Sequence, residues 1–133
     1  LRNFIVQNFR KAGVRISDNE GSTSTRDQFN NGSLELMGFI FFSNANFNAN
    51  TQSLLESKGL NVMKIQTGVD PQLANPFVRG SQPDFRPAAG SPALDPANVA
   101  PKFNDSFFDE APYVGAFSAT DNWIDGWTSW ITQ

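Results

Sequence analysis

The sequence contains neither cysteine nor histidine, and this absence excludes several kinds of chemistry. Without cysteine the chain has no disulfide and no thiolate nucleophile; without histidine it has no Ser-His-Asp triad and no ordinary zinc site. Charged residues make up only 17% of the chain, and the formal net charge of -3 comes with no cluster of basic residues. A nucleic-acid partner is therefore not expected. No apolar run is long enough to span a bilayer, so no membrane span is predicted.

Aromatic residues are plentiful instead, with 13 Phe and 3 Trp in 133 residues. A chain of this length forms one domain or a piece of one, and its aromatic side chains can supply a core. Asn, Ser, Thr and Gly are frequent and Lys is rare, which favours an extracellular or cell-surface bacterial protein. A strand-like pattern begins at Leu1, so we expect a fragment or a processed product of a longer chain.

Residues 1–16 contain a strand pattern that is partly repeated in residues 36–44. When the two segments are aligned, three apolar pairs coincide: Phe4 with Phe39, Ile5 with Ile40, and Val6 with Phe41. The continuously apolar run of residues 39–42 is typical of a strand that is covered on both faces. The repeat predicts two successive turns of one winding strand structure. Three residues that tolerate positive φ are expected at its corners: Asn3, Asn8 and Gly13.

The remaining segments predict shorter elements. Residues 17–32 are polar and predict an exposed loop. Residues 51–58 predict a helix with Thr51 as its N-cap and Gly59 as its stop. Residues 61–65 and 113–117 predict short strands. The proline-rich stretch from residue 70 to 101 predicts a wrapping segment without a long helix or a central strand.

A short motif at residues 90–95, of sequence GSPALD, follows these strands, and YVGAF follows it at residues 113–117. Together with the Asn- and Phe-rich strand repeat, these motifs resemble the C-terminal coils and cap of secreted bacterial right-handed parallel β-helix proteins of the pectate-lyase-like kind. The resemblance implies structural roles for six residues: Gly90, Ser91, Pro92, Asp95, Tyr113 and Gly115. It also implies an all-β fold, with a β-sandwich as the alternative.

The resemblance implies a division into two parts: β-helix coils over residues 1–69, with an inserted loop near 17–32, and a proline-rich wrap and Trp-containing cap over residues 70–133. A parallel β-helix exposes unpaired strand edges at its ends. We therefore expect the N-terminal end to stack on preceding coils of a longer precursor or on another protein chain.

The scaffold implies a non-catalytic structural or binding module, such as a stalk, an adhesin or an assembly component, rather than an enzyme. Two alternatives remain open. One is the terminal part of a carbohydrate-active β-helix enzyme, a polysaccharide lyase or a glycosidase. The other is a carbohydrate-binding domain. No catalytic residue is predicted, because no set of residues matches a known catalytic pattern.

Two candidate sites lie near the C-terminus. Trp123, Trp127 and Trp130 have the spacing of one helical face and could stack on a polysaccharide, although packing into the core is the stronger interpretation. Asp121 and Asp125 could contribute oxygen ligands to calcium, and a role as solvated turn residues is the stronger interpretation. Calcium is thus the candidate ion, and no other cofactor is predicted.

Overall fold

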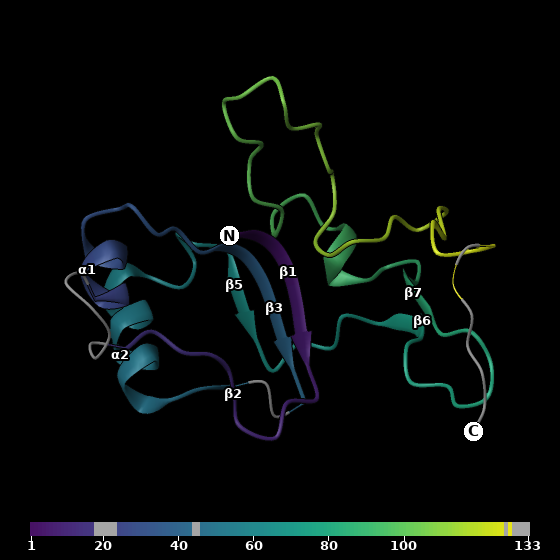
Figure 1. Ribbon diagram of the computed structural model, residues 1–133, viewed down its shortest axis with the longest axis horizontal. Coiled ribbons are helices and arrows are strands. Elements are labelled where there is room, and N and C mark those ends of the chain that lie inside the picture. Colours follow the sequence, from purple (N-terminus) through teal and green to yellow (C-terminus); the bar gives the residue numbers. More distant parts are fainter. Residues whose placement is uncertain (18–23, 44–45, 127, 129–133) are drawn as a thin grey trace.

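The computed structural model describes residues 1–17, 24–43, 46–126 and 128, and its architecture is mixed α/β. A parallel sheet with the order β1-β3-β5 lies at its centre (Figure 1). Its strands are β1 (Arg2–Gln7), β3 (Met37–Phe42) and β5 (Ile65–Thr67). Two helices lie to one side, α1 (Thr25–Asn30) and α2 (Ala49–Lys58).

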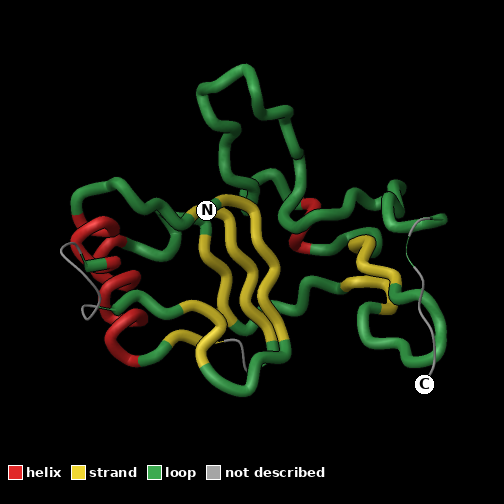
Figure 2. The backbone as a smooth tube through the Cα atoms, in the orientation of Figure 1, coloured by secondary structure: helices red, strands yellow, loops and turns green. Residues whose placement is uncertain are grey.

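Two smaller sheets complete the described elements. Strand β2 (Ala12–Val14) pairs in parallel with β4 (Asn46–Phe47). Strand β6 (Leu73–Asn75) pairs antiparallel with β7 (Asp84–Pro87), and a short 3-10 helix follows at Pro92–Leu94. Loops make up most of the C-terminal half (Figure 2). None of the helices in the described ranges is long and apolar enough to cross a membrane.

The central sheet has an apolar core on each face. Phe39 and Phe41 face the helices, where they join Phe29 of α1 and Leu55 of α2. Ile40 points the other way and packs with Ala93 and Val114 of the C-terminal half. Because parallel strands are typically covered on both faces, the uninterrupted apolar run in β3 has a direct physical reason.

Strands β1 and β3 share a kink, and the residue that precedes β5 continues it. Asn3, Gly38 and Lys64 lie side by side in the register, and all three have left-handed backbones, with φ of 58°, 71° and 53°. Five residues later, Asn8 and Ser43 repeat this pairing with φ of 59° and 50°. Neighbouring strands therefore follow the same path and stay in contact through both bends. The prediction of positive φ is confirmed at Asn3 and Asn8 and is wrong at Gly13, which lies within β2.

The pairing of the two repeated segments is confirmed, but the β-helix predicted from it is wrong. Phe4 pairs with Phe39, Ile5 with Ile40 and Val6 with Phe41, in parallel. The chain then forms helices at residues 25–30 and 49–58 and an antiparallel pair at β6 and β7, rather than further coils. Two helices and three small sheets also exclude the alternative β-sandwich. The division of the chain between residues 69 and 70 stays a prediction.

Several local predictions also need correction. The loop expected at residues 17–32 contains α1, which Ser24 caps by accepting a hydrogen bond from the Asp27 N–H at 3.1 Å. Helix α2 ends before Gly59 as expected, but its N-cap is Asn48 rather than Thr51. The strand expected at residues 61–65 begins only at Ile65, and residues 113–117 do not form a strand, since 113–116 are bends.

Candidate functional site

Strand β1 has one open edge. In the order β1-β3-β5 it pairs with β3 alone, so every second backbone N–H and C=O group along it points away from the sheet. Near the start of the strand the Gly115 N–H donates to the Asn3 carbonyl oxygen at 2.9 Å. No strand of the described ranges continues the ladder from there. An open edge of this kind is a template for pairing with another chain.

Both apolar cores extend as far as this edge. On one face the ring of Phe4 stacks on that of Phe39, with centroids 5.3 Å apart and an interplanar angle of 14°. On the other face Ile5 packs against the core that contains Ile40 and Val114. Phe39 and Ile40 are buried, whereas Phe4 remains 44% exposed and Ile5 is half-buried. Between Asn3 and Gln7 the edge therefore carries apolar side chains instead of the charges that commonly protect an edge strand.

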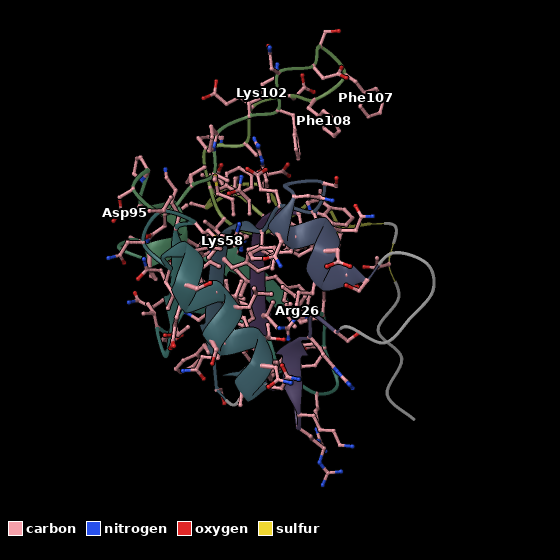
Figure 3. The ribbon with its side chains drawn as sticks, turned by 90° about the vertical axis from the view of Figure 1, so that its left-hand side faces the viewer. Arg26, Lys58, Asp95, Lys102, Phe107 and Phe108 are labelled. Carbon is pink, nitrogen blue, oxygen red and sulfur yellow. The ribbon has the colours of Figure 1, made fainter. Side chains whose placement is uncertain are left out.

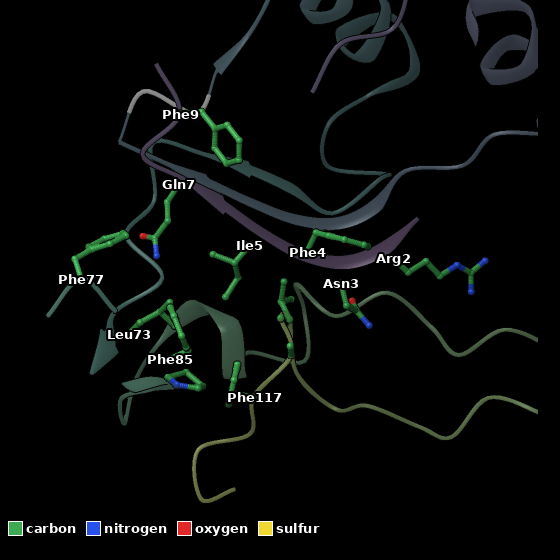
Figure 4. A pocket seen from close by; sticks show the side chains of 14 residues that line it. Arg2, Asn3, Phe4, Ile5, Gln7, Phe9, Leu73, Phe77, Phe85 and Phe117 are labelled. Atoms are coloured by element: carbon green, nitrogen blue, oxygen red, sulfur yellow. The ribbon is translucent and has the colours of Figure 1, made fainter. Parts of the chain in front are cut away.

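An apolar groove with a volume of about 540 Å³ runs beside the open edge (Figure 4). Strand β1 supplies one wall, and β6, β7 and residues 114–117 supply the other. Most of its lining is apolar: Phe4, Ile5, Phe9, Leu73, Phe77, Phe85, Pro87, Val114, Ala116 and Phe117. Phe9 and Phe77, which are 51% and 58% exposed, lie at one end together with Gln7 (Figure 4).

A glycine allows the close approach on which this groove depends. Gly115 has φ of 102°, and a Cβ atom added to it would lie 2.9 Å from Cδ1 of Ile5. Real Cβ atoms do not approach other heavy atoms so closely, and a side chain at this φ would also be strained. The resemblance implied a structural role for Gly115, and the structure places this residue against β1.

The opposite end of the groove contains a paired arginine. Arg2 donates from Nε and Nη2 to Glu35 Oε2 at 2.9 and 2.6 Å, so its charge is locally balanced. The same guanidinium lies 4.0 Å from the ring centroid of Phe103 and donates to the Pro101 carbonyl oxygen. Arg2 thereby links β1 to the base of a projecting loop, residues 101–112, which we call the arm.

The arm carries a second group of exposed aromatic residues. Phe103 and Phe108 pack with ring centroids 5.0 Å apart, and Phe107 meets Phe108 edge-on at 5.2 Å. Phe107 is 84% exposed and lies with Phe108 near the far end of the arm (Figure 3). The arm is distinct from the groove, because neither Phe103 nor Phe107 lines the groove.

Of the three candidate tryptophans, only Trp123 lies within the described residues. Its ring stacks on Phe117 at 5.1 Å and 15°, and its Nε1–H donates to the Ala116 carbonyl oxygen at 2.9 Å. Phe117 in turn meets Phe85 at 5.6 Å. Trp123 is still 46% exposed, so it packs at the end of an aromatic row that leads into the groove. Trp127 and Trp130 lie outside the described residues.

The candidate calcium ligands lie in exposed turns. Asp125 Oδ1 accepts hydrogen bonds from the side-chain amides of Gln82 and Asn122, and the Asp121 N–H donates to Ser118 Oγ. Within the described part of the chain, no three His, Cys, Asp or Glu side chains are grouped so that they could hold a metal ion.

The residues of the 90–95 motif have structural contacts. Buried Ser91 donates from Oγ to the Pro71 carbonyl oxygen at 2.6 Å and accepts from the Ala93 N–H at 3.0 Å. Pro92 begins the 3-10 helix, and Asp95 accepts from the Ala97 N–H at 2.9 Å. Gly90 has φ of 84°, and Tyr113 lies next to buried Val114. These contacts hold the segment that covers Ile40.

Sequence reasoning missed the groove itself. Its lining comes from segments more than 100 residues apart, from Ile5 to Phe117, and no periodic pattern joins them. The available signal was the presence of Phe9, Phe77 and Phe85 in stretches too rich in Pro, Gly and Asn for ordinary core elements. Large apolar residues that recur in such loops indicate a surface on which something packs.

Comparison with known proteins identifies no relative. No protein-family profile matches the chain, and neither a curated protein nor a solved structure does so.

Proposed function

We propose that this chain is a non-catalytic binding module of an extracellular or cell-surface assembly, and that it binds an extended polypeptide strand at the open edge of β1. The observation that carries the proposal is the half-exposed Phe4 ring, stacked on buried Phe39 at a strand edge without a pairing partner among the described strands. A strand added there would extend the backbone ladder and would cover Phe4 and Ile5 together.

The energetics favour a peptide strand as the ligand. Main-chain hydrogen bonds along an added strand supply affinity, and pockets beside the edge select side chains. Here the groove is the pocket, and its lining of Ile5, Leu73 and Phe85 suits a large apolar side chain. Burying such a side chain contributes about 1.5–3 kcal/mol before the costs of association.

The test uses a synthetic peptide that repeats residues 36–44, flanked by serines, because this sequence already pairs with β1 on its other side. Binding is followed by amide chemical shifts of the whole protein. We expect shifts at residues 3–9 and at the groove residues, with the β3 and β5 signals retained. Loss of the β3 signals would mean strand exchange, and shifts confined to other regions would also overturn the proposal.

Two matched variants sharpen this test. Phe4→Ser removes the exposed ring at the edge, and Phe107→Ser removes an even more exposed ring on the arm. We expect Phe4→Ser to weaken binding at least tenfold, because it removes an apolar contact worth more than about 1.4 kcal/mol. Phe107→Ser should leave binding unchanged. Equal effects of the two variants would indicate nonspecific adhesion to exposed aromatic residues.

A second candidate function is carbohydrate binding through Trp123. It is favoured by the exposed ring, which Phe117 supports by stacking. A polysaccharide that stacks on Trp123 would change tryptophan fluorescence, and Trp123→Ala would abolish that change while strand binding persists.

A further inference from the structure

We propose, building on the proposed function, that the strand bound at β1 runs parallel to it. Two of its residues, five positions apart, adopt a left-handed backbone, and acidic residues follow directly after the second one. The orientation and spacing come from the backbone of β1. The acidic residues are inferred from the charges at the end of β1.

The kinks of the sheet determine the path of a neighbouring strand. Asn3 and Asn8 are left-handed, and on β3 their neighbours Gly38 and Ser43 are left-handed too, again five residues apart. At the first kink Lys64 of the β5 side continues the row. A parallel strand with the same spacing can follow both bends; at the first bend it would take the place of Gly115, whose N–H donates to the Asn3 carbonyl oxygen at 2.9 Å. Gly and Asn are the residues that adopt this conformation at the lowest cost, so we expect them at the two positions.

Between the kinks, the partner should be apolar on both faces. One side chain of the partner strand continues the row of Phe39 and Phe4 and covers the exposed face of Phe4. The next side chain of the partner points to the other face and lies beside Ile5 at the groove. This arrangement requires consecutive large apolar residues, as β3 has at Phe39, Ile40 and Phe41. A strictly alternating strand would leave one of the two faces of the edge uncovered.

The basic residues near the groove that have no ion pair among the described residues lie at one end of it. Arg10 and Lys11 directly follow the groove residue Phe9, and Arg79 comes two residues after Phe77. All three are exposed, and none has an ion pair among the described residues. Two acids flank the loop that holds Phe77: Asp70 and Asp84. Asp84 is paired with Arg86, and Arg2 at the opposite end is paired with Glu35.

This asymmetry links the orientation of the partner to the position of its acidic residues. Arg10 and Lys11 lie in the bend that follows the end of β1 at Gln7, two and three residues after Asn8, so residues that follow the second kink of a parallel strand would run toward this bend. Acidic residues there would face basic ones. In an antiparallel strand the acids would have to precede the apolar residues instead. Exposed ion pairs of this kind add modest affinity but set orientation.

The experiment compares four peptides built on the residue 36–44 sequence: an uncharged one, one with two glutamates at the C-terminus, one with the glutamates at the N-terminus, and one with two lysines at the C-terminus. We expect the C-terminal glutamates to bind about threefold to tenfold more tightly than the uncharged peptide, as suits one or two exposed ion pairs. The lysine peptide should bind more weakly than the uncharged one.

Orientation is read directly with a nitroxide label at the C-terminus of the peptide. A parallel strand broadens the amide signals of residues 8–14, whereas an antiparallel one broadens those of residues 1–3. A peptide with valine in place of its first left-handed glycine should lose at least tenfold in affinity. The double variant Arg10→Gln with Lys11→Gln should remove the difference between the charged peptides without affecting the uncharged one.

The outcomes separate the two proposals. If the uncharged peptide does not bind at residues 3–9, strand binding itself fails. If it binds but the label reports an antiparallel strand, or N-terminal glutamates bind best, the proposed function stands and the parallel, acidic-ended partner is wrong. Tolerance of valine at the first kink would likewise overturn the spacing rule.

Discussion

Phe4 and Phe39 form a stacked pair with 5.3 Å between ring centroids, yet they lie in opposite environments: Phe39 is 2% exposed and Phe4 is 44% exposed. Phe39 is covered by β1, β5 and the helices, whereas Phe4 is covered on one side alone. The pair therefore marks the boundary where a continuous apolar core meets solvent along the edge of β1.

This difference predicts unequal stability costs for one substitution. Phe39→Ala leaves a buried cavity and should lower the free energy of unfolding by about 3–5 kcal/mol. Phe4→Ala removes a half-exposed ring and should cost about 1 kcal/mol, since only part of its surface is buried. Urea unfolding of the two variants measures both values. Similar losses would show that Phe4 is covered in solution and that the edge is not open.

The register of this pair could be predicted from the sequence because apolar residues coincide at three successive positions. A shift by one residue would place each side chain on the wrong face, so such a coincidence strongly restricts the pairing. The left-handed backbones of Asn3, Asn8 and Gly59 were predictable from residue type, because Asn and Gly tolerate this conformation and these three flank an apolar or helical pattern. The same reasoning failed at Gly13, which is part of β2.

The remainder of the fold depends on contacts that no local pattern carries. Helix α1 has six residues, of which only Phe29 is buried, and it lies in a stretch so polar that a loop was expected. The predicted β-helix was wrong because the parallel pairing of two segments does not determine which elements connect them. The groove escaped prediction because Phe77, Phe85 and Phe117 are brought to β1 only by the complete fold.

The kink at Gly38 supports a second prediction. A Cβ atom there would lie 2.5 Å from Asn3 Oδ1 and 2.9 Å from the Ala100 nitrogen, and φ is +71°. Asn3 Oδ1 also accepts a hydrogen bond from the Ala100 N–H at 2.7 Å, so Gly38→Ala would disturb this contact as well. We expect a loss of more than about 2 kcal/mol in the free energy of unfolding.

Gly32 is the matched control for this substitution. Its φ of +86° imposes a similar backbone strain on alanine, but nothing lies within 4 Å of the added Cβ. Gly32→Ala should lower the free energy of unfolding by about 1 kcal/mol, which is the strain of a left-handed alanine backbone alone. The difference between the two losses in the free energy of unfolding measures the steric contribution to the effect of Gly38→Ala. Equal losses would mean that the row of Asn3, Gly38 and Lys64 is not closely packed in solution.

Thr51 supports a third prediction. It is fully buried, and its Oγ1 accepts a hydrogen bond from the Ile16 N–H at 2.8 Å. Thr51→Val keeps the shape but leaves the Ile16 N–H without an acceptor, which costs about 1–3 kcal/mol. Thr51→Ser keeps the hydroxyl and should cost less, about 1 kcal/mol for the lost methyl group. Thermal unfolding compares them, and a serine variant less stable than the valine variant would contradict the role of this hydrogen bond.

The last prediction concerns the loss of stability at acidic pH. Arg86 donates from Nε and Nη2 to Asp84 at 3.0 and 2.7 Å, and this hydrogen-bonded pairing lowers the pKa of the Asp84 carboxyl. Because the folded-state pKa lies below the unfolded value of about 3.9, the pair stabilises the fold above that pH, and the contribution disappears as the pH falls through the folded-state pKa.

Substitution of the cation tests this linkage. Arg86→Gln should move the midpoint of the Asp84 carboxyl titration, followed by its carbon chemical shift, upward towards about 3.9. At neutral pH the variant should have a lower free energy of unfolding than the unsubstituted chain. The two values should converge once Asp84 is protonated. Arg79→Gln removes another exposed arginine, one without an ion pair among the described residues, and should leave the midpoint unchanged. An unshifted midpoint in Arg86→Gln would show that the pair at the start of β7 does not persist in solution.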